Sequence, residues 1–215
     1  MARIYTQNRG FQVKARAHKI TTTQAILHNL FTRVILNSTD FDPNNNLDIT
    51  IRTGTATSTL ANHLVDTGAT FGTSDVGAKV WNTTDNTYAI VTARNSATDV
   101  TLDTDIMVIG ETYTMYASKF VCPIDGVYSV KGSISFEALV DACYAVARIM
   151  KNHTTMIAQQ GGLTGGPGTV DLEASVIDQF AANDIITLEV YQTSGVTKNL
   201  IAAENTSLSI QLLSR

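Results

Sequence analysis

The sequence has few of the residues on which disulfide-rich, metal-binding and membrane proteins depend. Its 215 residues include only two cysteines and three prolines. Two cysteines cannot build a disulfide scaffold, and no Cys-x-x-Cys spacing exists, so we expect Cys122 and Cys143 to be buried free thiols. No apolar run could span a membrane, and residues 1–10 lack the apolar core of a signal peptide. We therefore expect a protein that is made in the cytoplasm, has no membrane partner and is not exported by a visible route.

Charged residues are scarce as well, at 16% of the chain, and the net charge is −4. An acidic protein of this kind is not expected to bind nucleic acid. Basic residues nevertheless gather at the start of the chain, before the first acidic residue, Asp40. We interpret residues 1–19 as a basic arm that docks on a negatively charged neighbour; a solvated tail with incidental charge is the alternative. The candidate docking residues are Arg3, Arg9, Phe11, Lys14, Arg16 and Lys19.

Thr, Asn, Ser, Ala and Gly are abundant, which is typical of an all-β protein. Thr and Val favour half-buried strands, whereas Asn and Gly favour turns. Residues 30–36 alternate as a buried strand would, and a polar loop over 41–48 follows. Residues 138–148 fit a helix or a strand, and 161–168 are expected to form a flexible Gly-rich loop. Further strands are expected at 127–136, 144–151, 154–160, 169–179, 185–192 and 206–213.

Residues 48–116 differ in composition from the flanking regions, being rich in Asp and Thr and carrying the only Trp. Residues 76–81 and 87–93, separated by a polar turn, predict a β-hairpin, and strands are expected at 99–102 and 113–116. A unit of this size is marginally stable alone, so we expect it to pack on a larger body. Its expected core is Leu64, Phe71, Val80, Trp81, Ile90, Val100 and Ile106.

Residues 119–128 predict a strand, a corner and a second strand, because Pro123 is excluded from central strands and Gly126 permits unusual backbone angles. Taken with residues 31–37 and Phe41-Asp42, this Lys-Phe-x-x-Pro-x-x-Gly-x-Tyr stretch resembles the globular head of complement component 1q. That family belongs with tumour necrosis factor among trimer-forming jelly rolls. Residues 183–188 and 207–213 are similar to its later strands. The resemblance implies a jelly-roll sandwich and a homotrimer.

The chain departs from the complement component 1q pattern in three ways. About seventy residues intervene before the Lys-Phe-x-x-Pro strand, the last strand lacks an aromatic-Gly-aromatic pattern, and no Gly-x-y stalk is present, which argues against a complement-type function. The expected fold is thus an all-β jelly-roll sandwich with a small β domain inserted between two of its early strands. The expected divisions are 1–19 (arm), 20–47 (jelly roll, first part), 48–116 (inserted domain) and 117–215 (jelly roll, remainder).

The expected inserted domain has a resemblance of its own. Residues 64–67, 77–89, 101–102 and 110–113, with their Val-x-Asn-Thr-Thr-Asp-x-Thr-Tyr-Ala core, look like a short β module of tailed-bacteriophage structural proteins. This resemblance implies a virion protein.

No motif in the sequence predicts catalysis or a cofactor. His18, His28, His63 and His153 lack paired metal-binding spacing, and no Ser lies in a nucleophile elbow. Asp40-x-Asp42-x-Asn44 begins like a calcium loop, but Asn45 and Ile51 stand where that motif requires Gly and Glu. Asp99, Asp103 and Asp105 form a second acidic cluster, for which turn capping is the simpler interpretation. We expect neither a metal site nor enzymatic activity.

The sequence therefore favours a non-enzymatic bacteriophage virion protein. The expected form is a homotrimeric capsid decoration or head-fibre protein that docks on the major capsid protein or another virion protein through its N-terminal segment. The alternative is a tail-tip or fibre adhesin that binds a host-surface glycan or protein through its loops. For that alternative, Trp81, Tyr88 and Tyr113 are candidate stacking residues, although a place in the core of the inserted domain is the simpler interpretation.

Overall fold

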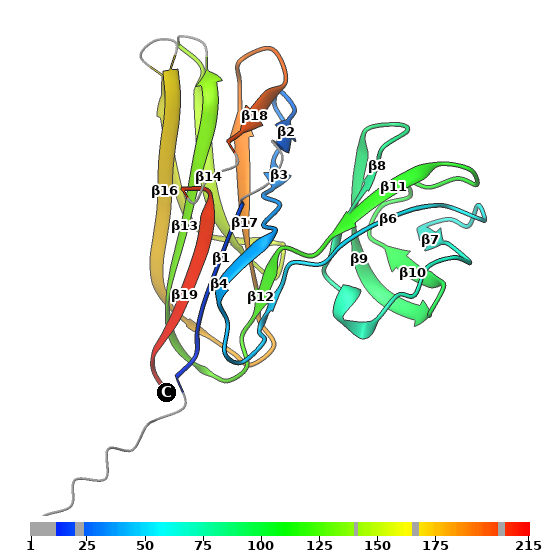
Figure 1. Ribbon diagram of the computed structural model, residues 1–215, viewed down its shortest axis with the longest axis horizontal. Coiled ribbons are helices and arrows are strands. Elements are labelled where there is room, and N and C mark those ends of the chain that lie inside the picture. Colours follow the sequence, from blue (N-terminus) through cyan, green and yellow to red (C-terminus); the bar gives the residue numbers. More distant parts are fainter. Residues whose placement is uncertain (1–11, 20–23, 140–141, 165–167, 202–204) are drawn as a thin grey trace, which may run out of the picture.

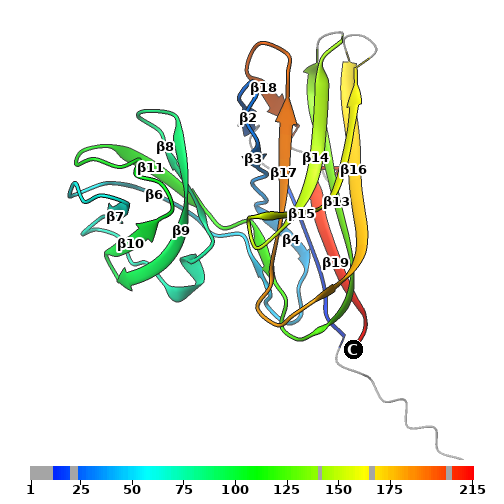
Figure 2. The same ribbon diagram turned by 180° about the vertical axis from the view of Figure 1, so that it is seen from behind.

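The protein is described by a computed structural model that covers residues 12–19, 24–139, 142–164, 168–201 and 205–215. Two long sheets face each other, and a third, smaller sheet projects from their side (Figures 1 and 2). The described strands pair antiparallel throughout, and the one described helix is a single 3-10 turn, η1 (Thr73–Asp75). No described helix is long and apolar enough to cross a membrane.

The first long sheet has seven strands in the order β2-β18-β13-β19-β1-β4, with β16 pairing on β13. The longest are β13 and β16, which run side by side over nearly their whole length (Figure 1). The strands are β1 (Lys14–His18), β2 (Gln24–Ile26), β4 (Ser38–Phe41), β13 (Gly126–Leu139), β16 (Gly168–Phe180), β18 (Lys198–Leu200) and β19 (Ser207–Ser214).

The second long sheet has six strands in the order β15-β14-β17-β12-β5, with β3 pairing on β17. Its strands are β3 (Thr32–Arg33), β5 (Leu47–Asp48), β12 (Lys119–Val121), β14 (Tyr144–Lys151), β15 (Thr155–Leu163) and β17 (Ile185–Gln192).

The two long sheets bury one shared apolar core, because alternate residues of each strand point inward. In β13, Tyr128, Val130, Ile134 and Phe136 are buried, whereas Lys131 between them is exposed. Tyr128 meets Phe120 and Phe180 edge to face, with ring centroids 6.3 and 5.8 Å away. This arrangement confirms the expected all-β jelly-roll sandwich.

The third sheet, which we call the small sheet, is formed by consecutive residues 51–116. Its six strands lie in the order β6-β11-β8-β9-β10-β7 and pair only with one another. A second apolar cluster, centred on Leu64, Phe71, Val80 and Val100, fills its interior. The strands are β6 (Ile51–Thr55), β7 (His63–Val65), β8 (Lys79–Asn82), β9 (Thr87–Ser96), β10 (Asp99–Leu102) and β11 (Thr112–Tyr116).

The chain leaves the jelly roll after β5 and returns through β12, and these two strands pair with each other. Leu47 lies opposite Phe120, and Asp48 lies opposite Lys119. This pairing fits the expected insertion, but the division of the chain into an arm, two jelly-roll parts and an inserted domain stays a prediction.

The expected corner over residues 119–128 is present between β12 and β13. A side chain at Gly126 would meet Leu212 Cδ1 at 2.5 Å and the carbonyl oxygen of Ser214 at 2.6 Å, so only Gly fits where β13 begins beside the end of β19. Gly126 therefore has a packing role.

Several expected strand limits are corrected by the structure. The strand predicted over 30–36 pairs with a neighbouring strand only in β3. Ser38–Phe41, which lies outside every predicted strand, forms β4 on the edge beside β1. Gly161 and Gly162, predicted as a flexible loop, continue β15 opposite Val146 and Ala145. In β4 and β15, pairing with a neighbouring strand outweighs the local preference of the residues. The ambiguous stretch 138–148 is strand at both described ends.

Candidate functional site at the junction of the jelly roll and the small sheet

The densest set of buried charges lies where the small sheet meets the jelly roll. Arg33 of β3 is fully buried. Its Nη1 donates to the carbonyl oxygens of Gly77, 2.7 Å away, and Ala117, 3.1 Å away. Gly77 precedes β8 and Ala117 follows β11, so one guanidinium of the jelly roll holds two backbone segments of the small sheet.

Two lysines make the same kind of contact. Lys119 of β12 is buried and donates through Nζ to the carbonyl oxygens of Ser74 and Val76, which lie around η1. Lys79 of β8 donates to the carbonyl oxygen of Phe31 over 3.4 Å, in the opposite direction across the junction. Burial lowers the pKa of Lys119 and lowers the pKa of Lys79 to about 8. The junction therefore holds its cations mainly against backbone carbonyl groups.

A carboxylate and two stacked rings complete the jelly-roll side of the junction. Arg148 donates through Nε and Nη2 to Oε2 of Glu189, over 2.9 and 2.6 Å. The same guanidinium lies 3.4 Å from the ring centroid of Phe31, and Phe31 stacks on Tyr191 with centroids 4.8 Å apart. Glu189 also favours the charged forms of Arg33 and Lys79, which partly offsets their burial.

His153 closes the junction from the turn between β14 and β15. It has a φ of +65°, and its Nδ1 lies 2.7 Å from Nη2 of Arg33. Burial, together with the charges of Arg33 and Lys119, lowers the pKa of His153 to about 4. The ring is therefore neutral near pH 7, and Nδ1 accepts the hydrogen bond from the guanidinium. A side chain at Gly77 would meet His153 Nε2 at 2.8 Å.

These contacts form a structural joint that fixes the small sheet against the six-stranded sheet. Sequence reasoning did not identify Arg33, Lys79, Lys119 or His153 as a group. The available signal was Arg33 itself, an ionised residue inside an otherwise apolar run, because such residues are almost never fully buried without partners.

The predicted docking residues do not lie on one flexible arm. Arg3, Arg9 and Phe11 are outside the described residues, whereas Lys14 and Arg16 belong to β1. Lys14 is exposed, and Arg16 pairs with Asp40. Lys19 is buried, and burial lowers its pKa. The backbone N–H of Lys19 bonds to the carbonyl oxygen of Thr206 and continues the sheet contact of β1, and docking through this residue stays a prediction.

The three candidate stacking residues fall into two environments. Tyr113 lies in the core of the small sheet and donates through its hydroxyl to Asp66 over 2.8 Å. Trp81 and Tyr88 lie opposite each other on β8 and β9, half-buried, with nearly parallel rings 6.1 Å apart. Lys79 Nζ lies 4.5 Å from the centroid of Tyr88. Trp81 is outside the small-sheet core in which it was expected, because it points away from its neighbour Val80.

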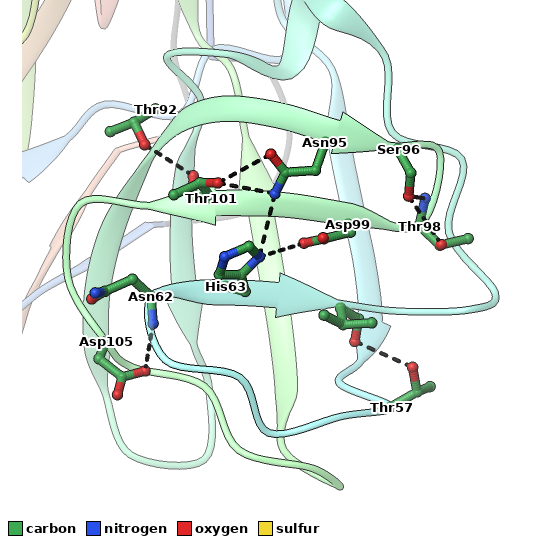
Figure 3. A network of polar contacts seen from close by, with 11 residues as sticks. Thr57, Asn62, His63, Thr92, Asn95, Ser96, Thr98, Asp99, Thr101 and Asp105 are labelled. Atoms are coloured by element: carbon green, nitrogen blue, oxygen red, sulfur yellow. Dashed lines mark hydrogen bonds and ion pairs between the residues drawn. The ribbon is translucent and has the colours of Figure 1, made fainter.

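The acidic clusters serve local structure. Asp40 pairs with Arg16 and lies 2.8 Å from His18 Nδ1, and Asp42 accepts a hydrogen bond from the N–H of Leu47. Figure 3 shows the second cluster, in which Asp99 contacts His63 Nδ1 over 2.7 Å and Asp105 accepts from the N–H of Asn62. Asp103 accepts from the N–H of Ile90.

Cys122 and Cys143 are both buried free thiols, as expected, and burial raises the pKa of Cys122 to about 12.

The two long sheets define a jelly roll of the complement 1q type. No protein-family model matches the sequence, and no curated protein matches it. Among solved structures, the globular domain of zebrafish complement 1qA protein matches with a TM-score of 0.51 and 9% identity, over 95% of this chain and 99% of that chain. Eiger TNF from S. frugiperda matches with a TM-score of 0.45 and 11% identity, over 94% of this chain and 93% of that one. At these identities the complement 1qA likeness shows the fold alone.

Proposed function

We propose that this protein is a non-enzymatic structural protein of a bacteriophage virion, present as a homotrimeric capsid decoration or head-fibre protein. The phage setting is supported by the resemblance of residues 64–113 to modules of tailed-phage structural proteins. The trimer is supported by the jelly-roll fold and by the resemblance of residues 31–42 and 119–128 to a trimer-forming family.

One observation carries the assembly: the small sheet projects from one edge of the jelly roll and leaves the outward face of the seven-stranded sheet open (Figures 1 and 2). Arg33, Lys119 and Glu189, which make or support the junction, all belong to the six-stranded sheet. The outward face of the seven-stranded sheet is covered by no described element. We therefore assign the trimer contact to that open face.

The open face is suited to close packing of copies. One row across it consists of Arg16, Ser209, Lys131 and Ser175, and the next contains Gln211, Ser129 and Ile177. Small serines permit close approach of a neighbouring sheet, and Ile177 is 65% exposed. An exposed apolar residue beside small polar ones fits a contact that is buried on assembly.

Light scattering of the purified protein tests the trimer. The expected mass is three times 23.2 kDa, about 70 kDa. Ile177→Asp should lower the mass towards that of one chain, because it places a charge in the contact. Ile109→Asp, at the equally exposed Ile109 of the small sheet (64%), should leave the mass unchanged. A wild-type mass of one chain would contradict the proposal.

Capsid docking is tested separately by cosedimentation with purified capsids that lack the protein. The deletion should remove residues 2–11 and stop before β1, because loss of Lys14–His18 would remove a central strand. We expect the deletion to form trimers and to lose capsid binding. Unchanged binding would contradict docking through the N-terminal segment and leave the trimer assignment intact.

A second candidate function is an adhesin that binds a host-surface glycan or protein. It is favoured by the stacked, half-buried pair Trp81 and Tyr88, since aromatic faces commonly pack on ligands. Trp81→Ala should then reduce binding of the purified protein to host cells at least about tenfold. Tyr144→Ala, which removes an exposed aromatic ring of β14, is the matched control. Equal binding by the wild type and both variants would contradict the adhesin function.

A further inference from the structure

A groove of about 810 Å³ lies beside the junction, on the side of η1 and β12. It is lined by the loop between β4 and β5, by β5 itself, by η1 and by β12, with Asn183 and Ile185 from the start of β17. Its volume falls within the range of about 300–1,000 Å³ that is typical of ligand sites, which often form where two packed units meet.

The lining of the groove has an apolar part, which we call the base, and a polar part, which we call the rim. Leu47, Ile49, Val121 and Ile185 supply the apolar surface. No hydrogen bond in the described part of the chain uses the rim side chains, so their hydroxyl and amide groups are available to a ligand. These rim residues are Thr39, Asn45, Thr50, Thr73, Ser74 and Asn183.

The charges in the groove disfavour an anionic ligand. Lys119 is its one lining cation, and that ammonium is buried and already bound to two carbonyl oxygens. Asp48 is its one lining anion; one of its carboxylate oxygens accepts from the N–H of Thr50, and the other is buried without a partner among the described residues. The side-chain nitrogen of Asn46 is also buried without a described partner. Among the lining residues that the structure describes, none therefore offers a free cation to a phosphate or carboxylate ligand.

We propose that the groove binds a neutral saccharide, with an N-acetylated hexosamine as the best match. Each sugar hydroxyl both donates and accepts hydrogen bonds, as the Thr, Ser and Asn side chains of the rim do. The acetamido methyl and the C–H face of the ring would lie on the apolar base. This site is separate from Trp81 and Tyr88 and does not depend on capsid attachment.

Saturation-transfer NMR on the full-length protein tests the assignment, with N-acetylglucosamine as the probe at about 10 mM, a concentration suited to a dissociation constant of about 1 mM. We expect transfer to the acetamido methyl protons. Thr73→Trp, which places a bulky ring on the exposed rim, should reduce that signal at least about fivefold. Thr197→Trp, at an exposed Thr in the loop before β18, is the matched control and should retain it.

Asn183→Gly is a second variant, which removes the amide, tolerates the positive φ at this position and decides the question if Thr73→Trp does not fold. Loss of one amide should weaken binding about two- to tenfold. The proposal is overturned if the wild type gives no transfer, or if the folded groove variants bind as the wild type does. Stronger transfer to N-acetylneuraminate, which is anionic, would overturn the assignment to a neutral sugar.

Discussion

The centre of the jelly roll and its junction with the small sheet are stabilised by different physical means. At the centre, apolar side chains such as Phe120, Tyr128 and Phe136 exclude water, and stability follows the area that they bury. At the junction, Arg33 and Lys119 are equally buried, but they bind backbone carbonyl groups. Burial of a charge is unfavourable unless its hydrogen bonds are satisfied. The stability of the junction therefore depends on the direction and length of these hydrogen bonds. The apolar centre should therefore tolerate small shifts of its side chains, whereas the junction should not tolerate small shifts of its donors and acceptors.

The largest effect is expected at the apolar centre. Phe136→Ala should lower the free energy of unfolding by about 3–5 kcal/mol, because it leaves a cavity between two sheets that cannot both relax. Chemical denaturation monitored by circular dichroism measures this. Leu213→Ala, at a 50% exposed position of β19, should cost less than about 1 kcal/mol. Similar losses of unfolding free energy for the two variants would mean that the stability of the jelly roll is not set mainly by buried apolar area.

The junction is tested next by Arg33→Met, which keeps most of the side-chain volume and removes the donors. We expect a loss of about 2–4 kcal/mol, because the carbonyl groups of Gly77 and Ala117 lose a buried partner. Hydrogen exchange should show the loss first in the small sheet. Arg94→Met, which removes one hydrogen bond from an exposed guanidinium to the carbonyl oxygen of Phe71, is the control. A variant as stable as the wild type would show that apolar packing can replace the charge.

Acidification should weaken the junction through His153. Its pKa is about 4 in the folded protein and about 6.5 when unfolded, so the unfolded chain binds the proton more readily. The contribution is complete above pH 6.5 and is lost as the pH falls towards 4. We expect a loss of about 1–2 kcal/mol between pH 6.5 and 4.5.

The measurement for His153 is denaturation at several pH values, with His153→Asn as the control. Asn tolerates the positive φ at this position, keeps an acceptor oxygen and does not titrate. The difference between the two pH profiles isolates the histidine. Parallel profiles would contradict the role assigned to His153.

The smallest effect comes from a matched pair of glycines, both with positive φ. Gly77→Ala and Gly110→Ala share a backbone strain of about 1 kcal/mol. At Gly77 the new methyl group would also meet His153 and Ile185, 2.8 and 2.9 Å away, whereas nothing lies within 4 Å at Gly110. We expect Gly77→Ala to cost about 1 kcal/mol more, measured by thermal denaturation. Equal costs would indicate that the junction is loosely packed.

Most of the fold could be predicted from local pattern, and the junction could not. In the long strands from Gly126 to Ser214, apolar and polar residues alternate clearly. Pro123 and Gly126 indicate the corner between β12 and β13 in the sequence. β4 was missed because the pairing of Ser38–Phe41 with β1 is a tertiary contact that its composition does not favour. Arg33 and His153 are 120 residues apart, so no spacing rule joins them.

The candidate stacking residues show a signal that was present but not used. Val80 and Trp81 are neighbours in one strand, and neighbouring side chains of a strand point to opposite faces. Both could not belong to the small-sheet core. Alternation alone could have placed Trp81 and Lys79 together on the face of β8 that points away from the small-sheet core. It could not have predicted that Lys79 donates to the carbonyl oxygen of Phe31 in the jelly roll.

The pairing of β5 with β12 has a consequence for protein engineering. Asp48 and Lys119 are direct partners in a ladder, so their Cα atoms are about 5 Å apart, a gap that a two-residue turn spans. The chain between them can therefore be exchanged without moving the ends that the jelly roll must hold. This position is therefore suited to replacement of the small sheet by a different β unit on the same jelly-roll scaffold.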